Sequence, residues 1–146
     1  MVRRVEDHKR RAPDLSVEFD SDAGAPRKAR TAIGELISRD DDPLSAEVET
    51  VTSELVSNVV QHTDGGGTMD AWEPKPDVPI RIEVTDHGDG RPEPALHTDP
   101  TEVGGQGLRI VEEMADAWGV EYRPGGKKVW VEFDRDARSN PSRDGA

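Results

Sequence analysis

Apolar and polar residues alternate in four short segments, and this period of two predicts β-strands. The segments span residues 15–19, 80–86, 118–123 and 127–133. Pro124, Gly125 and Gly126 separate the last two segments and predict the turn of a hairpin. The stretch 68–79 contains three prolines, so we expect a loop there, with residues 69–72 forming at most a stub of strand.

Apolar residues at helical spacing predict three helices, one from Pro26 until the run Asp40–Pro43 stops it, one at about 45–62 and one at 108–115. Pro26 suits the first turn of a helix, Ser45 can cap the second helix, and the run Gly65–Gly67 ends it. The predicted order β, α, α, β, α, β, β indicates an α+β fold. We expect a two-layer α/β sandwich, in which a mixed sheet is covered on one face by helices.

The composition limits the classes of protein that fit. The 146 residues correspond to one domain, and 31 acidic against 19 basic residues give a net charge of −12, which argues against direct nucleic-acid binding. Cysteine is absent, which excludes disulfides and thiolate zinc sites. Without a long apolar segment we expect no membrane span and no secretion signal, hence a soluble, cytoplasmic protein. Residues 1–13 and 134–146 are expected to be disordered tails around a domain at 14–133.

The helix predicted at 45–62 carries a polar pair beside its apolar stripe. Glu54 and Asn58 lie four residues apart and therefore share one face. A carboxylate can act as a base, and an amide oxygen is a suitable ligand for Mg²⁺. An ordinary solvated helix face is the alternative interpretation. The buried stripe is expected to consist of Val48, Val51, Leu55, Val56 and Val59.

The strand predicted at 80–86 ends in a carboxylate. Asp86 shares a face with Ile80, Ile82 and Val84, so burial of that face requires a hydrogen-bond donor for Asp86. The exocyclic amine of adenine is such a donor, and Gly88 and Gly90 would let a flat base approach the backbone. A strand that ends in an exposed turn is the alternative.

A glycine-rich segment at 104–108 precedes the last predicted helix. Backbone N–H groups at a helix N-terminus can bind phosphate, although for this segment alone a flexible loop is the better explanation of the glycines. The preceding loop, 91–104, is longer than usual connections, which indicates a functional or disordered segment. His87 and His97 have no third ligand at zinc spacing.

The order of these motifs resembles the Bergerat-fold (GHKL, histidine-kinase-like) ATPase domain, and most of all its branch of anti-sigma-factor serine/threonine kinases. Residues 54–62 are similar to the N-box of that branch, 86–90 to the first glycine box and 105–111 to the second. Residues 118–120 and 126–130 are similar to its closing hairpin. The resemblance covers about residues 15–133.

The resemblance implies roles for individual residues. Glu54 would be the catalytic base, Asn58 would hold the Mg²⁺ that bridges the ATP phosphates, and Asp86 would bind the adenine amine. Residues 91–104 would form a lid over the nucleotide. The remaining nucleotide-binding positions would be Gly88, Gly90, Gly105, Gly107 and Leu108.

The resemblance further implies an ATP-dependent kinase that phosphorylates a STAS-type anti-sigma-factor antagonist, sequesters a sigma factor and forms a homodimer. A binding module that holds ATP without efficient catalysis and a plain ATPase are the alternatives. The chain has Gln106 where relatives often carry Arg, Lys127 where other branches have Thr, and hardly any strand before residue 80. His62 is expected to pack on its helix, and Trp118 and Trp130 in the hairpin core.

Overall fold

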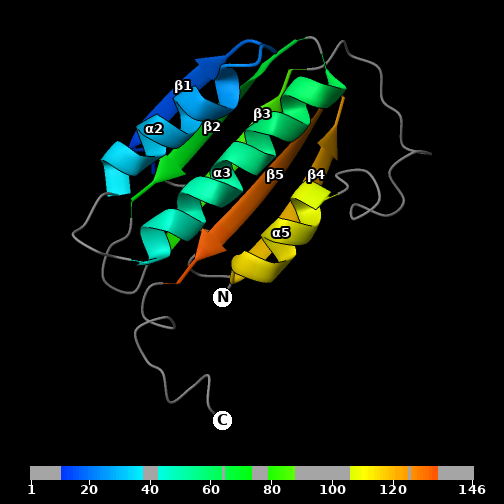
Figure 1. Cartoon of the computed structure of the whole chain (residues 1–146). Helices are drawn as coiled ribbons and strands as arrows, with labels where there is room; N and C mark the ends of the chain where they lie inside the picture. The colour runs from blue at the N-terminus through cyan, green and yellow to red at the C-terminus, as the bar shows by residue number, and fades with distance from the viewer. Residues whose placement is uncertain are drawn as a thin grey trace.

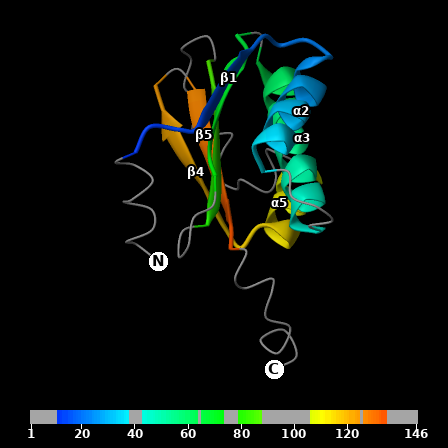
Figure 2. The ribbon, with the colours of Figure 1, turned by 90° about the vertical axis from the view of Figure 1, so that its left-hand side faces the viewer.

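A computed structural model describes residues 11–37, 43–63, 65–73, 79–87, 106–124 and 126–134. Within these residues the chain forms two layers, with a β-sheet on one side and the helices on the other (Figures 1 and 2). Figure 2 shows that the helices leave the other face of the sheet uncovered, and this face is called the outer face. This arrangement confirms the predicted α+β sandwich.

The sheet has five strands in the order β1-β2-β3-β5-β4. All of its described pairs are antiparallel, whereas we predicted a mixed sheet. Only β2–β3 and β4–β5 follow each other directly in the chain; two helices (residues 25–37 and 43–62) connect β1 to β2, and one helix (residues 106–114) and β4 connect β3 to β5. Each of these connections brings the next strand back antiparallel to its neighbour. The strands are β1 (Leu15–Phe19), β2 (Gly67–Trp72), β3 (Ile80–Asp86), β4 (Ala117–Arg123) and β5 (Gly126–Phe133).

Strand β2 corrects the prediction of a loop before residue 80. It pairs with β1 over five positions and with β3 over six. Met69 and Ala71 alternate toward the helices and are fully buried. The prolines that argued against a strand all lie beyond Trp72, so none of them interrupts the ladder. The sheet therefore contains a complete strand at Gly67–Trp72, where the sequence pattern predicted at most a stub.

The three described helices cover one face of the sheet and form the core with it. They are α2 (Ala25–Ile37), α3 (Pro43–His62) and α5 (Gln106–Met114). In Figure 1, α3 crosses the middle of the sheet with α2 on one side and α5 on the other, and both contact it. The predicted stripe of α3 is buried as expected. Burial of this apolar surface drives the packing of the two layers; the stripe comprises Val48, Val51, Leu55, Val56 and Val59.

The outer face carries a buried group of charged side chains around Arg81. Arg81 donates from Nε to Glu83 Oε2 and from Nη1 to Glu132 Oε2, both at 2.8 Å. Lys128 Nζ lies 3.1 Å from Glu83 Oε1, and the guanidinium carbon of Arg81 lies 4.6 Å from the Trp130 ring centroid. Burial raises the pKa of Glu83, but the hydrogen bonds and charges of Arg81 and Lys128 outweigh it and leave that pKa below its usual value.

The predicted tails fall mostly outside the described residues, but Arg11, which belongs to the first of them, contacts the folded domain. The indole Nε1 of Trp72 donates to the carbonyl oxygen of Arg11 at 2.8 Å. Arg11 also pairs with Asp14 at 3.2 Å. In the part of the chain that is described, no helix is long and apolar enough to span a membrane.

We expect Gly66→Ala to destabilise the fold by about 1–3 kcal/mol. Gly66 has φ of +71°, and a Cβ there would overlap the carbonyl oxygen of Phe19. Urea unfolding of the variant measures the effect. Gly24→Ala is the control, because its Cβ would only contact Asp22 Oδ1 at 3.4 Å. Equal stability of the two variants would contradict this account of Gly66.

Candidate functional site

Helix α3 carries Glu54 and Asn58 on the flank that faces α5. A Cβ on Gly34 of α2 would lie 2.9 Å from Glu49 Oε2, so the flank of α3 with Glu49 faces α2. At 100° per residue, Asn58 lies about 180° and Glu54 about 140° around the helix from Glu49. Both side chains are half-buried. They therefore lie at the margin of the core on the opposite flank from α2, which is where α5 packs.

Asp86 ends β3 on the helix-facing side of the sheet. Its neighbours on that face, Ile82 and Val84, are buried in the core. Asp86 itself is half-buried, and its Oδ1 accepts a hydrogen bond from the backbone N–H of Lys127 at 3.3 Å. The position of Asp86 below the helix layer agrees with the period-two prediction.

Sheet pairing brings Asp86 to the same end of the molecule as the C-terminal end of α3. Gly67, which follows α3 by a short turn, pairs with Asp86. His87 N–H donates to the carbonyl oxygen of Gly66 at 2.8 Å. Figure 1 shows the β4–β5 turn at this end as well, whereas α5 begins further down the flank of α3. The end of the N-box helix and the start of the first glycine box therefore lie close together.

The glycine positions are only partly described. Gly107 and Leu108 lie in the first turn of α5, where backbone N–H groups without helical partners can bind an anion. Gly88, Gly90, Gly105 and the predicted lid, 91–104, lie outside the described residues. Their roles stay predictions.

The oxygen atoms that the protein offers near this end suit a magnesium ion that takes most of its ligands from phosphate and water. Asn58 and Glu54 offer hard oxygen atoms, which Mg²⁺ prefers. Among the described residues no group of three or more His, Cys, Asp and Glu side chains could enclose a metal by itself. Mg²⁺ is commonly held by one or two protein groups together with phosphates and water. The donor set fits that mode.

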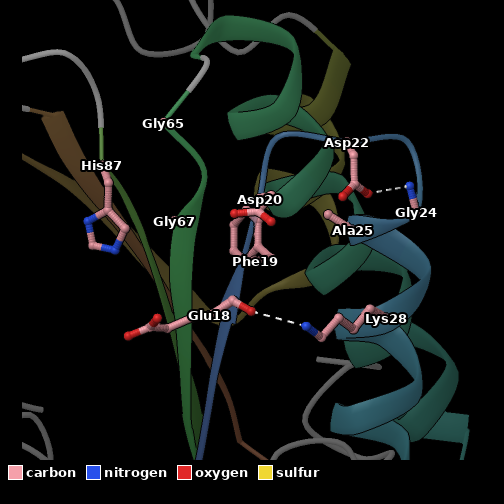
Figure 3. A pocket seen from close by; sticks show the side chains of 10 residues that line it. All are labelled: Glu18, Phe19, Asp20, Asp22, Gly24, Ala25, Lys28, Gly65, Gly67 and His87. Carbon is pink, nitrogen blue, oxygen red and sulfur yellow. Dashed lines mark hydrogen bonds between the residues drawn. The ribbon is translucent and has the colours of Figure 1, made fainter.

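A cavity of about 480 Å³ lies at the N-terminal end of α2 (Figure 3), and neither Glu54 nor Asn58 is among the residues that line it. Glu18, Asp20 and Asp22 line it against a single lysine, Lys28, whose Nζ donates to the carbonyl oxygen of Glu18 at 3.2 Å. An excess of carboxylates disfavours a triphosphate. We therefore do not assign this cavity to a nucleotide.

Two expectations for single residues were wrong, and one was right. His62 is exposed, because it lies in the last turn of α3, where the sheet no longer covers it. Trp130 lies on the outer face over Arg81 instead of in the core. Trp118 packs against the core, as predicted.

From the sequence, Lys127 was identified only as a departure from the family pattern and was given no role. In the structure it follows the turn next to Asp86, and burial lowers its pKa while the negative charge of Asp86 raises it in part. The alternation of β5 was the available signal. Lys127 is in phase with the apolar residues that face the helices: Val129, Val131 and Phe133.

The two-layer fold, in which the helix with Glu54 and Asn58 crosses the sheet beside the strand that ends in Asp86, is that of an ATP-binding domain of the histidine-kinase-like class. The chain belongs to the histidine kinase-like ATPase domain family, whose pattern matches residues 19–133. No curated protein matches the chain.

Among solved structures, the fold is similar to that of the RsbU and RsbW domains of Rv1364c from Mycobacterium tuberculosis. The TM-score is 0.60 and the sequence identity 22%, over 84% of this chain and 33% of that chain. This chain thus spans about a third of the length of that structure. At this identity the likeness demonstrates a common fold.

Proposed function

We propose that this protein is an ATP-dependent serine/threonine kinase of the anti-sigma-factor type. The observation that carries the proposal is that Glu54 and Asn58 lie on the flank of α3 opposite Glu49, toward α5, while Asp86 ends β3 beside the strand that follows α3. Membership of the histidine kinase-like ATPase family supports ATP as the nucleotide. The motifs of the sequence and the fold shared with a structure that contains an RsbW domain support the anti-sigma-factor branch.

Each residue has a distinct task in this proposal. Asp86 accepts a hydrogen bond from the adenine amine, and the first turn of α5 receives phosphate oxygens. Asn58 would hold Mg²⁺, which neutralises phosphate charge when it is bound. Glu54 takes the proton of the attacking serine hydroxyl, while the serine oxygen forms a bond to the γ-phosphorus. The bond between that phosphorus and the β–γ bridging oxygen breaks at the same time, which releases ADP.

The proposed protein substrate is a STAS-type anti-sigma-factor antagonist, and the proposed second partner is a sigma factor, both in the cytoplasm. A homodimer would present these partners with two copies of the site. The net charge of −12 favours regulation through proteins over direct contact with nucleic acid. Pull-down of sigma factors and antagonists with and without ATP tests the choice of partners, and recovery of neither in either condition would contradict it.

The nucleotide site is tested by Asp86→Asn. We expect this variant to bind Mg·ATP about 10- to 100-fold more weakly, because a charged acceptor for the adenine amine is lost. Isothermal titration calorimetry measures the affinity, and circular dichroism checks that the fold is kept.

Asp22→Asn is the matched control for that experiment. Asp22 lines the cavity at the start of α2, and its Oδ1 accepts from Gly24 N–H at 2.9 Å, a bond that asparagine can also accept. Its ATP affinity should equal that of the unaltered protein. Unchanged affinity in Asp86→Asn, or a loss in Asp22→Asn instead, would move the adenine site away from Asp86.

A further inference from the structure

Lys127 lies opposite Asp86 on the helix-facing side of the sheet. Strands β3 and β5 pair in register, with Thr85 opposite Lys128, so the next step of the same register places Lys127 opposite Asp86. Directly opposed side chains on one face of an antiparallel pair have Cβ atoms about 4.5–5.5 Å apart. Lys127 shares its face with the core residues of β5: Val129, Val131 and Phe133.

The turn before Lys127 is pressed against Asp86. Lys127 N–H donates to Asp86 Oδ1 at 3.3 Å. A Cβ on Gly126, which has φ of +153°, would overlap both Asp86 Oδ1 and the Asp86 carbonyl oxygen. Glycine is therefore required for this close approach, which fixes the start of β5 beside the carboxylate.

The ammonium of Lys127 is partly desolvated. Burial lowers the pKa of Lys127, and attraction to Asp86 opposes that effect. Of the two lysines of β5, Lys128 forms an ion pair on the outer face, where its partner is Glu83. A half-buried ammonium favours a nearby hydrogen-bond acceptor. Asp86 and Lys127 together thus present one acceptor and one donor side by side.

We propose that Lys127 determines base specificity by donating a hydrogen bond to N1 of adenine, next to the bond that Asp86 accepts from the 6-amine. Adenine presents a donor at N6 and an acceptor at the adjacent N1, which matches the carboxylate and ammonium pair. Guanine presents an acceptor at position 6 and a donor at N1, the reverse order. The inference rests on the proposed function, since it requires that Asp86 binds a purine.

The test compares Mg·ATP with Mg·1-deaza-ATP, in which a C–H replaces ring N1, by calorimetry on the full chain. A hydrogen bond to a charged group predicts about 10- to 100-fold weaker binding of 1-deaza-ATP to the unaltered protein. In Lys127→Met, ATP should weaken by a similar factor, and the two nucleotides should bind equally. Lys127→Gln, which keeps a neutral donor, should retain part of the difference.

Lys128→Met is the matched control, because it removes the same charge from the adjacent residue on the opposite face. It should distinguish ATP from 1-deaza-ATP as the unaltered protein does. Purine riboside triphosphate, which lacks the 6-amine, should bind more weakly than ATP to Lys127→Met, and this difference should be smaller in Asp86→Asn, which keeps only a neutral acceptor. Urea unfolding establishes that each variant is folded.

Equal binding of ATP and 1-deaza-ATP by the unaltered protein would overturn the role of Lys127. Discrimination that persists in Lys127→Met, or tighter binding of GTP than ATP, would overturn it as well. All three results leave ATP binding intact. Failure of the unaltered protein to bind any adenine nucleotide is a different result, which would reject the proposed function and this inference together.

Discussion

Glu54→Gln should reduce phosphate transfer to a STAS-type antagonist by about 10²- to 10⁴-fold, the usual contribution of a general base. Glutamine keeps the size of the side chain but cannot accept the hydroxyl proton. ATP affinity should change little, because the assigned role of Glu54 concerns the attacking group and not the nucleotide. Transfer of radiolabelled γ-phosphate under single-turnover conditions measures the rate, and calorimetry measures the affinity.

Glu49→Gln is the control for this experiment. Glu49 lies on the same helix, is half-buried like Glu54, and faces α2 on the opposite flank. Its substitution should leave the transfer rate unchanged. Transfer that survives Glu54→Gln would remove Glu54 from its role, whereas ATP binding without transfer by the unaltered protein would favour a module that acts by binding alone.

Local periodicity was sufficient to place Glu54, Asn58 and Asp86. All three lie within single elements of regular geometry, a 20-residue helix and a seven-residue strand. In such elements the sequence alone determines which residues share a face. The flank of α3 that turns toward α5 depends instead on packing between segments distant in the chain, and only the structure provides it.

Sheet register was the part that sequence reasoning could not supply. The proximity of Asp86 and Lys127 joins residues 41 positions apart, and no local pattern encodes such a pairing. The sequence predicted at most a stub of strand in place of β2, because three prolines follow Trp72 before residue 80. In an antiparallel sheet a strand needs only the residues that pair, and Gly67–Trp72 contains no proline.

Arg81 illustrates why alternation predicts a face but not burial. The pattern correctly placed Arg81 and Glu83 opposite the apolar residues of β3, a face on which charged side chains are usually solvated. Arg81 is nevertheless only 1% exposed. Its second carboxylate partner, Glu132, is 51 residues away in the chain. Burial of the charge thus depends on a strand pairing that the sequence pattern does not specify.

Arg81→Met should destabilise the protein by about 3–5 kcal/mol, the usual cost of removing one partner from a buried ion pair. Glu83 and Glu132 would keep their burial, with 8% side-chain exposure each, but lose the guanidinium that both contact. Urea unfolding at neutral pH measures the loss. Arg30→Met, at an exposed position of α2, is the control and should change stability by less than about 0.5 kcal/mol.

The pH dependence separates this explanation from simple loss of packing. Because the pKa of Glu83 is lower in the folded than in the unfolded chain, its contribution is present above its unfolded pKa and is lost as the pH falls through the folded pKa. Without Arg81 the carboxylates can protonate more readily, so the difference between variant and unaltered protein should shrink on acidification. Adding Glu83→Leu and Glu132→Leu to Arg81→Met should recover most of the stability at neutral pH, since the uncompensated charges are then gone. A penalty independent of pH and unaffected by the two leucines would mean that Arg81 stabilises the sheet through its contact with Trp130 and not through its charge.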